Sequence, residues 1–353
     1  MSEVNTDEPL LIIAPAWVGD MVMVSAMTCH VAQQFPNRAI DLLAPAWTLP
    51  IVRRLPHVRD AIEMPLGHGA FAPRTRWRIG IDLRDRSYGQ AIILPRAWKA
   101  ALVPYAADIP VRTGFLGEVR YGLLNDIRRL TKAHLPRTVD RFMALATPAD
   151  QPFTPPPLPN LELSYDHQAG YAVLNRFLDE DAQTQSWVAL CPGAEYGPAK
   201  QWPASHFAQT ASAILKEGHG VMLLGSQKDA PICEEILNQA EITGPLLSLA
   251  GKTSLNEAVD LLSVAKTVIT NDSGLMHVAT AVDSHVIALF GSSDPGHTPP
   301  LSDQADTLWL GMPCSPCFKR ECPEGHLNCL LEITPQQVLA VWHNQLGKMD
   351  HGA

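Results

Sequence analysis

Short hydrophobic runs alternate along the chain with longer segments in which apolar residues recur every three or four positions. In the first half the runs at residues 10–14, 39–44 and 90–94 are followed by such segments at 20–35, 46–54 and 97–107. Short apolar runs predict strands, and the longer periodicity predicts amphipathic helices. Repeated alternation of the two is typical of a mainly parallel sheet covered by helices on both faces.

The alternation stops at a proline-rich segment and then restarts. Residues 148–159, PADQPFTPPPLP, hold six prolines in twelve positions, which predicts a semi-rigid linker because proline lacks a backbone donor and favours extended chain. Strands are then expected at residues 187–191, 220–224, 246–250, 267–270 and 286–290, and helices at 204–217, 230–240, 255–265 and 274–282. This predicts an α/β protein of two doubly wound, Rossmann-like domains, with ligands in a cleft at the carboxyl ends of their strands.

The expected N-terminal domain covers residues 1–160 and includes the linker, and the C-terminal domain covers 161–332. A last helix within 333–353 is expected to pack back on the N-terminal domain. A chain of 353 residues with 46% hydrophobic content can bury two cores of this size.

Composition and charge narrow the possible partners. No apolar run reaches the roughly 20 residues that span a bilayer, and Asp20 interrupts the apolar N-terminal segment, so a cytoplasmic protein is expected. Residues 1–150 hold 18 Lys and Arg against 14 Asp and Glu, whereas the remainder holds 9 against 22. The basic half suits an anionic acceptor or an anionic membrane surface and argues against duplex nucleic acid, although an ordinary solvated charge distribution is the alternative.

The segment 268–281, VITNDSGLMHVATA, passes from a β-branched run through Asn-Asp-Ser-Gly into an apolar helix. A helix N-terminus presents unpaired N–H groups, which favour an anion or a hydroxyl ligand. Gly274 allows a ligand to approach the backbone, Asp272 can orient a hydroxyl, and His277 follows one turn later. The alternative is a helix cap followed by a core histidine.

Three further junctions carry polar residues after predicted strands. Asp20 in APAWVGDM is either a helix N-cap or a general base, and Lys200 in CPGAEYGPAKQWP is a point charge suited to a pyrophosphate. The third junction is LGSQKD at 224–229. The chain contains neither the ATPase phosphate-loop motif nor the G-x-G-x-x-G fingerprint, which makes a nicotinamide dehydrogenase a poor candidate.

In their order and spacing, WVGDM, PGAEYGPAKQWP, LLGSQKD, AGKTSL and NDSGLMHVATA resemble the ADP-heptose:lipopolysaccharide heptosyltransferases, glycosyltransferase family 9, over nearly the whole chain. Residues 90–126 and 312–329 are most similar to the heptosyltransferase II branch. The resemblance implies a GT-B fold and an inverting transfer of L-glycero-D-manno-heptose from ADP-heptose to the first heptose of the inner core on Kdo-lipid A. It also implies peripheral contact with the cytoplasmic face of the inner membrane.

The resemblance assigns roles to single residues. Asp20 matches the base that deprotonates the acceptor hydroxyl, and Lys200 matches the lysine that contacts the donor pyrophosphate. The expected donor-binding residues are Glu195, Tyr196, Asp229, Thr253, Asp272, Ser273, Gly274 and His277. Because Lys200 and helix N-termini can stabilise the leaving group, no cofactor is expected to be required, and a divalent cation such as Mg²⁺ held through Asp272 is the alternative.

Basic residues in the N-terminal domain are candidates for acceptor binding, because arginine binds carboxylates and phosphates in a bidentate manner. They are Arg74, Arg76, Arg78, Arg84 and Arg86 in the densest basic run, with Lys99, Arg112 and Arg120 as secondary candidates. The alternative for the dense run is a solvated helix, with Asp82 and Asp85 as local partners.

Four cysteines, Cys314, Cys317, Cys322 and Cys329, lie close together in the sequence, with His326 among them. Their spacing is compatible with a zinc site, with disulfides or with reduced thiols in a structural loop. Because disulfides are disfavoured in the cytoplasm, the sequence favours reduced thiols, and no metal ligand is assigned.

Two rival functions remain at this point. A heptosyltransferase I would act directly on Kdo, and a non-catalytic sugar-nucleotide-binding protein would use the two domains as a clamp. The combination of Asp20 and Lys200 disfavours the clamp, since binding alone needs no base opposite the pyrophosphate.

Overall fold

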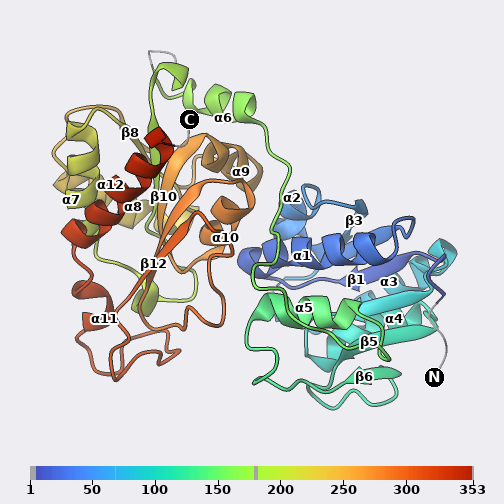
Figure 1. The fold of residues 1–353 in the computed structure, drawn as a ribbon. Helices are drawn as coiled ribbons and strands as arrows, with labels where there is room; N and C mark the ends of the chain where they lie inside the picture. The colour runs from blue at the N-terminus through green and yellow to red at the C-terminus, as the bar shows by residue number, and fades with distance from the viewer. Residues whose placement is uncertain (1–4, 68, 179–181, 352–353) are drawn as a thin grey trace. The chain divides into compact units, whose positions relative to one another are not determined.

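The computed structural model describes residues 5–67, 69–178 and 182–351 (Figure 1). The chain forms two compact units, Met1–Leu163 and Ser164–Ala353. Each is built on a six-stranded sheet whose paired strands are parallel, as the alternating pattern predicts. No helix among the described residues is long and apolar enough to cross a membrane.

The sheet of the first unit has the order β3-β2-β1-β4-β5-β6. Its strands are β1 (Leu10–Ile13), β2 (Ile40–Pro45), β3 (Val58–Met64), β4 (Gln90–Ile93), β5 (Val111–Phe115) and β6 (Asp126–Arg128). Its helices are α1 (Val18–Gln34), α2 (Leu49–Val52), α3 (Pro73–Asp82), α4 (Leu102–Ala106) and α5 (Thr138–Ala146). The central strands β1 and β4 are buried along their whole length because helices cover both faces of the sheet.

Two predicted helices of this unit are shorter than the sequence pattern indicates. The segment 46–54 forms a 3₁₀ turn at Ala46–Thr48 and then α2, and the segment 97–107 forms a 3₁₀ turn at Trp98–Ala101 and then α4. Each α-helix has a proline in its first turn, Pro50 or Pro104. Proline is tolerated there but not within a helix, which explains why each segment is divided just before it.

The sheet of the second unit has the order β12-β11-β10-β7-β8-β9. Its strands are β7 (Trp187–Cys191), β8 (Gly220–Leu223), β9 (Leu246–Ser248), β10 (Ala265–Asn271), β11 (His285–Phe290) and β12 (Ala305–Trp309). Its helices are α6 (His167–Leu174), α7 (Ala204–Lys216), α8 (Ala230–Gln239), α9 (Leu255–Val264), α10 (Gly274–Ala281), α11 (Asn328–Leu331) and α12 (Pro335–His351).

Both sheets place the first strand of the unit in the centre, paired with the second and the fourth. The order in which successive strands are added to the sheet therefore reverses between β1 and β4 in one unit and between β7 and β10 in the other, which is the topological switch point of each sheet. Open α/β sheets bind ligands beyond the carboxyl ends of the strands at this switch point. The loops after these strands are thus the positions to search for a site.

The last helix contributes to the core of the second unit. α12 packs against α7 and β11, as Figure 1 shows in red. Val338 and Trp342, one turn apart, are fully buried in the same core as Trp202 and Phe207. The apolar stripe of this helix is therefore filled within its own unit, and packing on the N-terminal domain stays a prediction.

Candidate active site

The loops after β7 and β10 are joined by the side chain of Asn271. The backbone N–H of Trp202 donates to Asn271 Oδ1 at 3.0 Å, and Asn271 Nδ2 donates to the carbonyl of Pro192 at 2.7 Å. Asn271 is fully buried, so these bonds are protected from water. No role for Asn271 is predicted from the sequence, although it stands next to the predicted Asp272.

Asp272 lies at the centre of the candidate site. Its Oδ2 accepts a hydrogen bond from Lys200 Nζ at 2.5 Å and another from the Ser293 hydroxyl at 2.5 Å. The Asp272 side chain is 6% exposed and that of Lys200 16%, so the ion pair is largely shielded from water. The structure thereby brings together two predicted residues, and the carboxylate fixes the position of the ammonium group.

Ser293 was not predicted; it lies three positions after the end of β11, whereas Asp272 directly follows β10. The signal for it in the sequence is a hydroxyl residue after a central strand, since the carboxyl ends of parallel strands share one edge of the sheet.

Tyr196 lies between two cationic side chains. Lys200 Nζ is 5.1 Å and Arg320 Cζ is 5.4 Å from the centroid of its ring, within the range of cation–π attraction. The Tyr196 hydroxyl donates to the carbonyl of Phe318 at 2.8 Å, and Ala199 N–H donates to the carbonyl of Arg320 at 3.0 Å. Arg320 thus adds a second positive charge near Lys200, from a distant segment that no local pattern connects to this loop.

Asp229 lies against the same loop after β7. A Cβ at Gly193 would lie 2.5 Å from the Asp229 carboxylate, so glycine alone permits this approach. Asp229 Oδ2 accepts from the backbone N–H and the hydroxyl of Ser226, which closes a capping box before α8. Glu195, also on the loop, forms an exposed ion pair with Lys228 at 2.5 Å.

The remaining donor-site candidates lie at two helix starts. Ser273 is the N-cap of α10 and Gly274 its first residue, so the N-terminus of this helix follows directly on Asp272. The Ser273 and Thr270 hydroxyl oxygens are 3.3 Å apart. Thr253 is half-buried on the loop before α9, and its hydroxyl donates to the carbonyl of Leu249 at 3.4 Å.

His277 is buried one turn into α10, with 3% of its surface exposed. Burial lowers the pKa of its imidazole to about 4, Asp272 opposes this shift, and the Lys200 charge adds to it. Its Nδ1 has no hydrogen-bond partner among the residues that the structure describes. A neutral ring with an unsatisfied nitrogen beside the Lys200–Asp272 pair is consistent with a ligand contact.

Asp20 belongs to the first unit, in the first turn of α1 directly after β1. The helix begins at Val18 and its N-cap is Trp17, so the alternative of Asp20 as the N-cap is wrong. Met21 N–H bonds to the carbonyl of Trp17 at 2.9 Å, which places the half-buried Asp20 carboxylate beyond the capping position. Asp20 thus lies at the β1 end of the switch point, where a ligand of this unit is expected.

The predicted acceptor-binding cations are not brought together. Arg76 is 9% exposed and donates to the carbonyls of Ala70 and Phe71, and Arg120 is 1% exposed and donates to those of Pro95 and Phe115. These two guanidinium groups hold loops in place, because buried carbonyls require donors.

The other cations divide into paired and exposed groups. Arg112 donates to the carbonyls of Ile109 and Leu123, Lys99 to that of Gly69, Arg84 pairs with Asp108, and Arg86 pairs with Asp41 and Asp60. The ion-pair partners of Arg84 and Arg86 are therefore not the Asp82 and Asp85 that the sequence analysis considered. Arg74 and Arg78 are exposed on α3.

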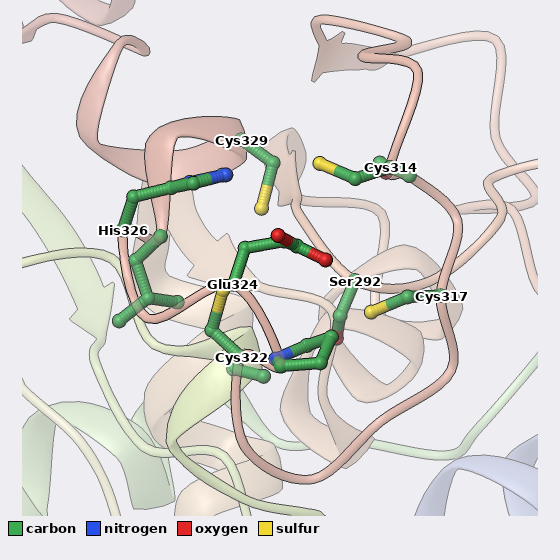
Figure 2. Close-up of a pocket in the computed structure, with 11 residues that line it drawn as sticks. Ser292, Cys314, Cys317, Cys322, Glu324, His326 and Cys329 are labelled. Atoms are coloured by element: carbon green, nitrogen blue, oxygen red, sulfur yellow. The ribbon is translucent and has the colours of Figure 1, made fainter.

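The seven cysteines, all within the described ranges, are free thiols. Cys314, Cys317, Cys322 and Cys329 line one pocket together with Glu324 and His326 (Figure 2). In the described part of the chain, no three His, Cys, Asp or Glu side chains already stand as a metal-ligand set.

Comparison with known proteins gives a consistent result. The family model of glycosyltransferase family 9 (heptosyltransferase) matches residues 76–328. Lipopolysaccharide heptosyltransferase 2 of Escherichia coli K12 is 42% identical over 339 residues, which cover 94% of this chain and 96% of that protein.

Solved structures agree with the sequence comparison. The E. coli ADP-heptose lps heptosyltransferase II superposes with a TM-score of 0.85 at 38% identity, covering 97% of this chain and 99% of that one. The E. coli heptosyltransferase WaaC with ADP has a TM-score of 0.71 at 17% identity, covering 96% and 99%, and shares the fold.

Proposed function

The chain belongs to glycosyltransferase family 9, the heptosyltransferases, and we propose that this enzyme transfers L-glycero-D-manno-heptose from ADP-heptose to the first heptose of the lipopolysaccharide inner core. The acceptor is then Kdo-lipid A that already carries one heptose. The observation that carries this choice of acceptor is the similarity to heptosyltransferase 2 over nearly the full length of both chains. The architecture of two units, each with one six-stranded parallel sheet, is the GT-B fold.

In the second unit, the Lys200–Asp272 pair and the start of α10 form the donor site. We assign the donor pyrophosphate to Lys200, because the ammonium is held by Asp272 in a shielded position at the switch point. When the bond between the heptose and the pyrophosphate breaks, negative charge grows on the departing ADP. A cation that is already in place stabilises that charge without reorganisation.

In the first unit, Asp20 acts as the general base. It accepts the proton of the acceptor hydroxyl while that oxygen bonds to the anomeric carbon, and the bond from this carbon to the ADP phosphate breaks. Attack from the face opposite the leaving group inverts the anomeric configuration, and no covalent enzyme intermediate is formed. The position of Asp20 at the β1 end of the switch point supports this role.

No cofactor is required in this scheme, because Lys200 and the α10 N-terminus supply the positive potential; Mg²⁺ held through Asp272 is the alternative. We place the enzyme in the cytoplasm, in peripheral contact with the inner membrane where its lipid-linked acceptor lies. The exposed Arg74 and Arg78 on α3, next to the exposed Trp77, support an anionic and partly apolar partner on this face.

The test is mass spectrometry of the product after incubation of the purified protein with ADP-heptose. Heptose-free Kdo-lipid A and its mono-heptosylated form are supplied in parallel reactions. We expect the gain of one heptose on the mono-heptosylated acceptor alone. Gain on the heptose-free acceptor would indicate a heptosyltransferase I, and no gain on either would leave a sugar-nucleotide-binding protein.

A further inference from the structure

Residues 310–327, all of which the structure describes, connect β12 to α11 without forming a helix or a strand. Most of their side chains are exposed, and the segment contributes little to the hydrophobic core. A connection of this length inside a compact domain is uncommon and requires either a function or a stabilising element of its own.

The segment is nevertheless closely fitted to the donor-site loop. Besides the hydrogen bonds of the Phe318 and Arg320 carbonyls to Tyr196 and Ala199, a Cβ at Gly197 would lie 2.5 Å from the Arg320 carbonyl oxygen. Such close backbone contact requires the segment to be held in one conformation. Apolar burial contributes little to this, and the hydrogen bonds of Phe318 N–H to the Ser292 carbonyl and of the Ser315 hydroxyl to the Gly291 carbonyl fix only part of the segment.

Four thiols are the most conspicuous candidates. Cys314, Cys317 and Cys322 lie in this segment and Cys329 in α11, and all four line one pocket. Figure 2 shows the four side chains around this pocket, with Glu324 between them.

Cys322 stands at the start of a tight turn. The backbone N–H of Gly325 donates to the carbonyl of Cys322 at 3.2 Å, and Gly325 and Leu327 both have positive φ, at 72° and 53°. The turn brings Cys322 and Cys329 to the same pocket although they are separated in the sequence.

We propose that Cys314, Cys317, Cys322 and Cys329 bind one zinc ion as thiolates, and that this zinc site holds residues 310–327 against the donor-site loop. Four sulfur ligands from a C-x₂-C pair and two further cysteines suit the tetrahedral preference of zinc. The thiols are not yet at ligand positions in the described structure, so binding includes rotation of the cysteine side chains between staggered rotamers. His326 stays outside the ligand set, because its Nδ1 accepts the Asn328 N–H at 3.0 Å and Nε2 of the neutral ring then carries the proton.

The first experiment measures metal content of the full-length protein by inductively coupled plasma mass spectrometry. We expect about one zinc per chain in the wild type and at least a tenfold lower content in Cys322→Ser and Cys317→Ser, because each removes one of four ligands. Cys29→Ala, which removes a thiol of the first unit, and His326→Gln should both retain the metal. Loss of zinc in His326→Gln would overturn the four-sulfur ligand set.

The second experiment uses Co²⁺ as a spectroscopic probe of the metal-free protein. We expect thiolate-to-metal charge transfer and intense visible bands of a tetrahedral ion in the wild type and not in Cys322→Ser. Zinc removal should also increase hydrogen–deuterium exchange in residues 310–327 while leaving β1 and β4 protected. Absence of both zinc and Co²⁺ uptake, or a mass about 4 Da below the reduced chain from two disulfides, would overturn the proposal.

Discussion

Lys200 and Asp272 form a shielded ion pair in which Asp272 also accepts the Ser293 hydroxyl. Lys200→Met should weaken ADP binding by about 10- to 100-fold, because a hydrogen bond to a charged group contributes about 1.5–3 kcal/mol. Isothermal titration calorimetry with ADP measures this change.

The single variant also leaves the Asp272 carboxylate without its cation, which can reduce folding stability. The double variant Lys200→Met/Asp272→Asn removes both charges and serves as the control. It should fold with a thermal midpoint close to that of the wild type and still bind ADP weakly. ADP binding of wild-type strength in the double variant would show that Lys200 has a structural role only.

His277 makes stability depend on pH. Its pKa is about 4 in the folded chain, against 6.5 for an ordinary histidine, because burial disfavours the imidazolium. Between these values the unfolded chain binds the proton more readily, so stability is full above pH 6.5 and is lost as the pH falls toward 4. Glutamine does not titrate, so the thermal unfolding midpoint of His277→Gln should decrease less between pH 7.5 and pH 5 than that of the wild type. Equal losses would contradict the burial of a neutral ring.

At the scale of residues, sequence patterns point to side chains that lie at the junctions between strands and helices. Lys200, Asp272 and His277 stand at two strand–helix junctions, and the structure brings them together. Arg320 was not predicted, because its approach to Tyr196 depends on the course of an irregular segment that carries no periodic signal. The predicted arginines failed to cluster for a related reason: sequence shows their charge, but not the buried carbonyls that engage Arg76 and Arg120.

At the scale of elements, the turn after β7 depends on Gly197. Its φ of 151° is unfavourable for other residues, and a Cβ would lie 2.5 Å from the Arg320 carbonyl oxygen. Gly197→Ala should therefore displace residues 310–327 and weaken ADP binding several-fold, with a smaller effect on the thermal midpoint. Gly244→Ala is the matched control, since its nearest contact would be an ordinary 3.6 Å. Equal ADP affinities for both variants would exclude this role of the turn.

The central strands could be predicted from sequence because helices cover them on both faces and their residues are continuously apolar. The edge strands β3, β6 and β12 were not predicted, and neither was the interior strand β5, although the edge strand β9 was predicted at residues 246–250. Asp60 and Glu63 interrupt β3, β6 is only Asp126–Arg128, and all three strands are partly exposed. An edge strand has one paired neighbour and little burial, so its sequence carries a weak signal.

At the scale of the whole molecule, the chain consists of two units, each with its own core. The proline-rich segment indicated the division from composition alone, and the structure separates the units after Leu163. The packing partner of the last helix could not be predicted from composition, because an apolar stripe indicates that a helix is packed but does not identify the surface that it packs against. In the structure its Trp342 completes the core that supports the donor site.

Trp342→Ala tests the independence of the two units. Removing a fully buried tryptophan should destabilise the second unit by about 3–5 kcal/mol, because a cavity remains in its core. Hydrogen–deuterium exchange should then increase in β7, β10 and α12 but not in β1, β2 or β4, and saturating ADP should partly restore the protection. The control is His343→Ala, which removes only an exposed ion pair with Glu217 on the same helix. A parallel loss of protection in β1 would show that the two cores unfold together, and that the donor site cannot loosen without the first unit.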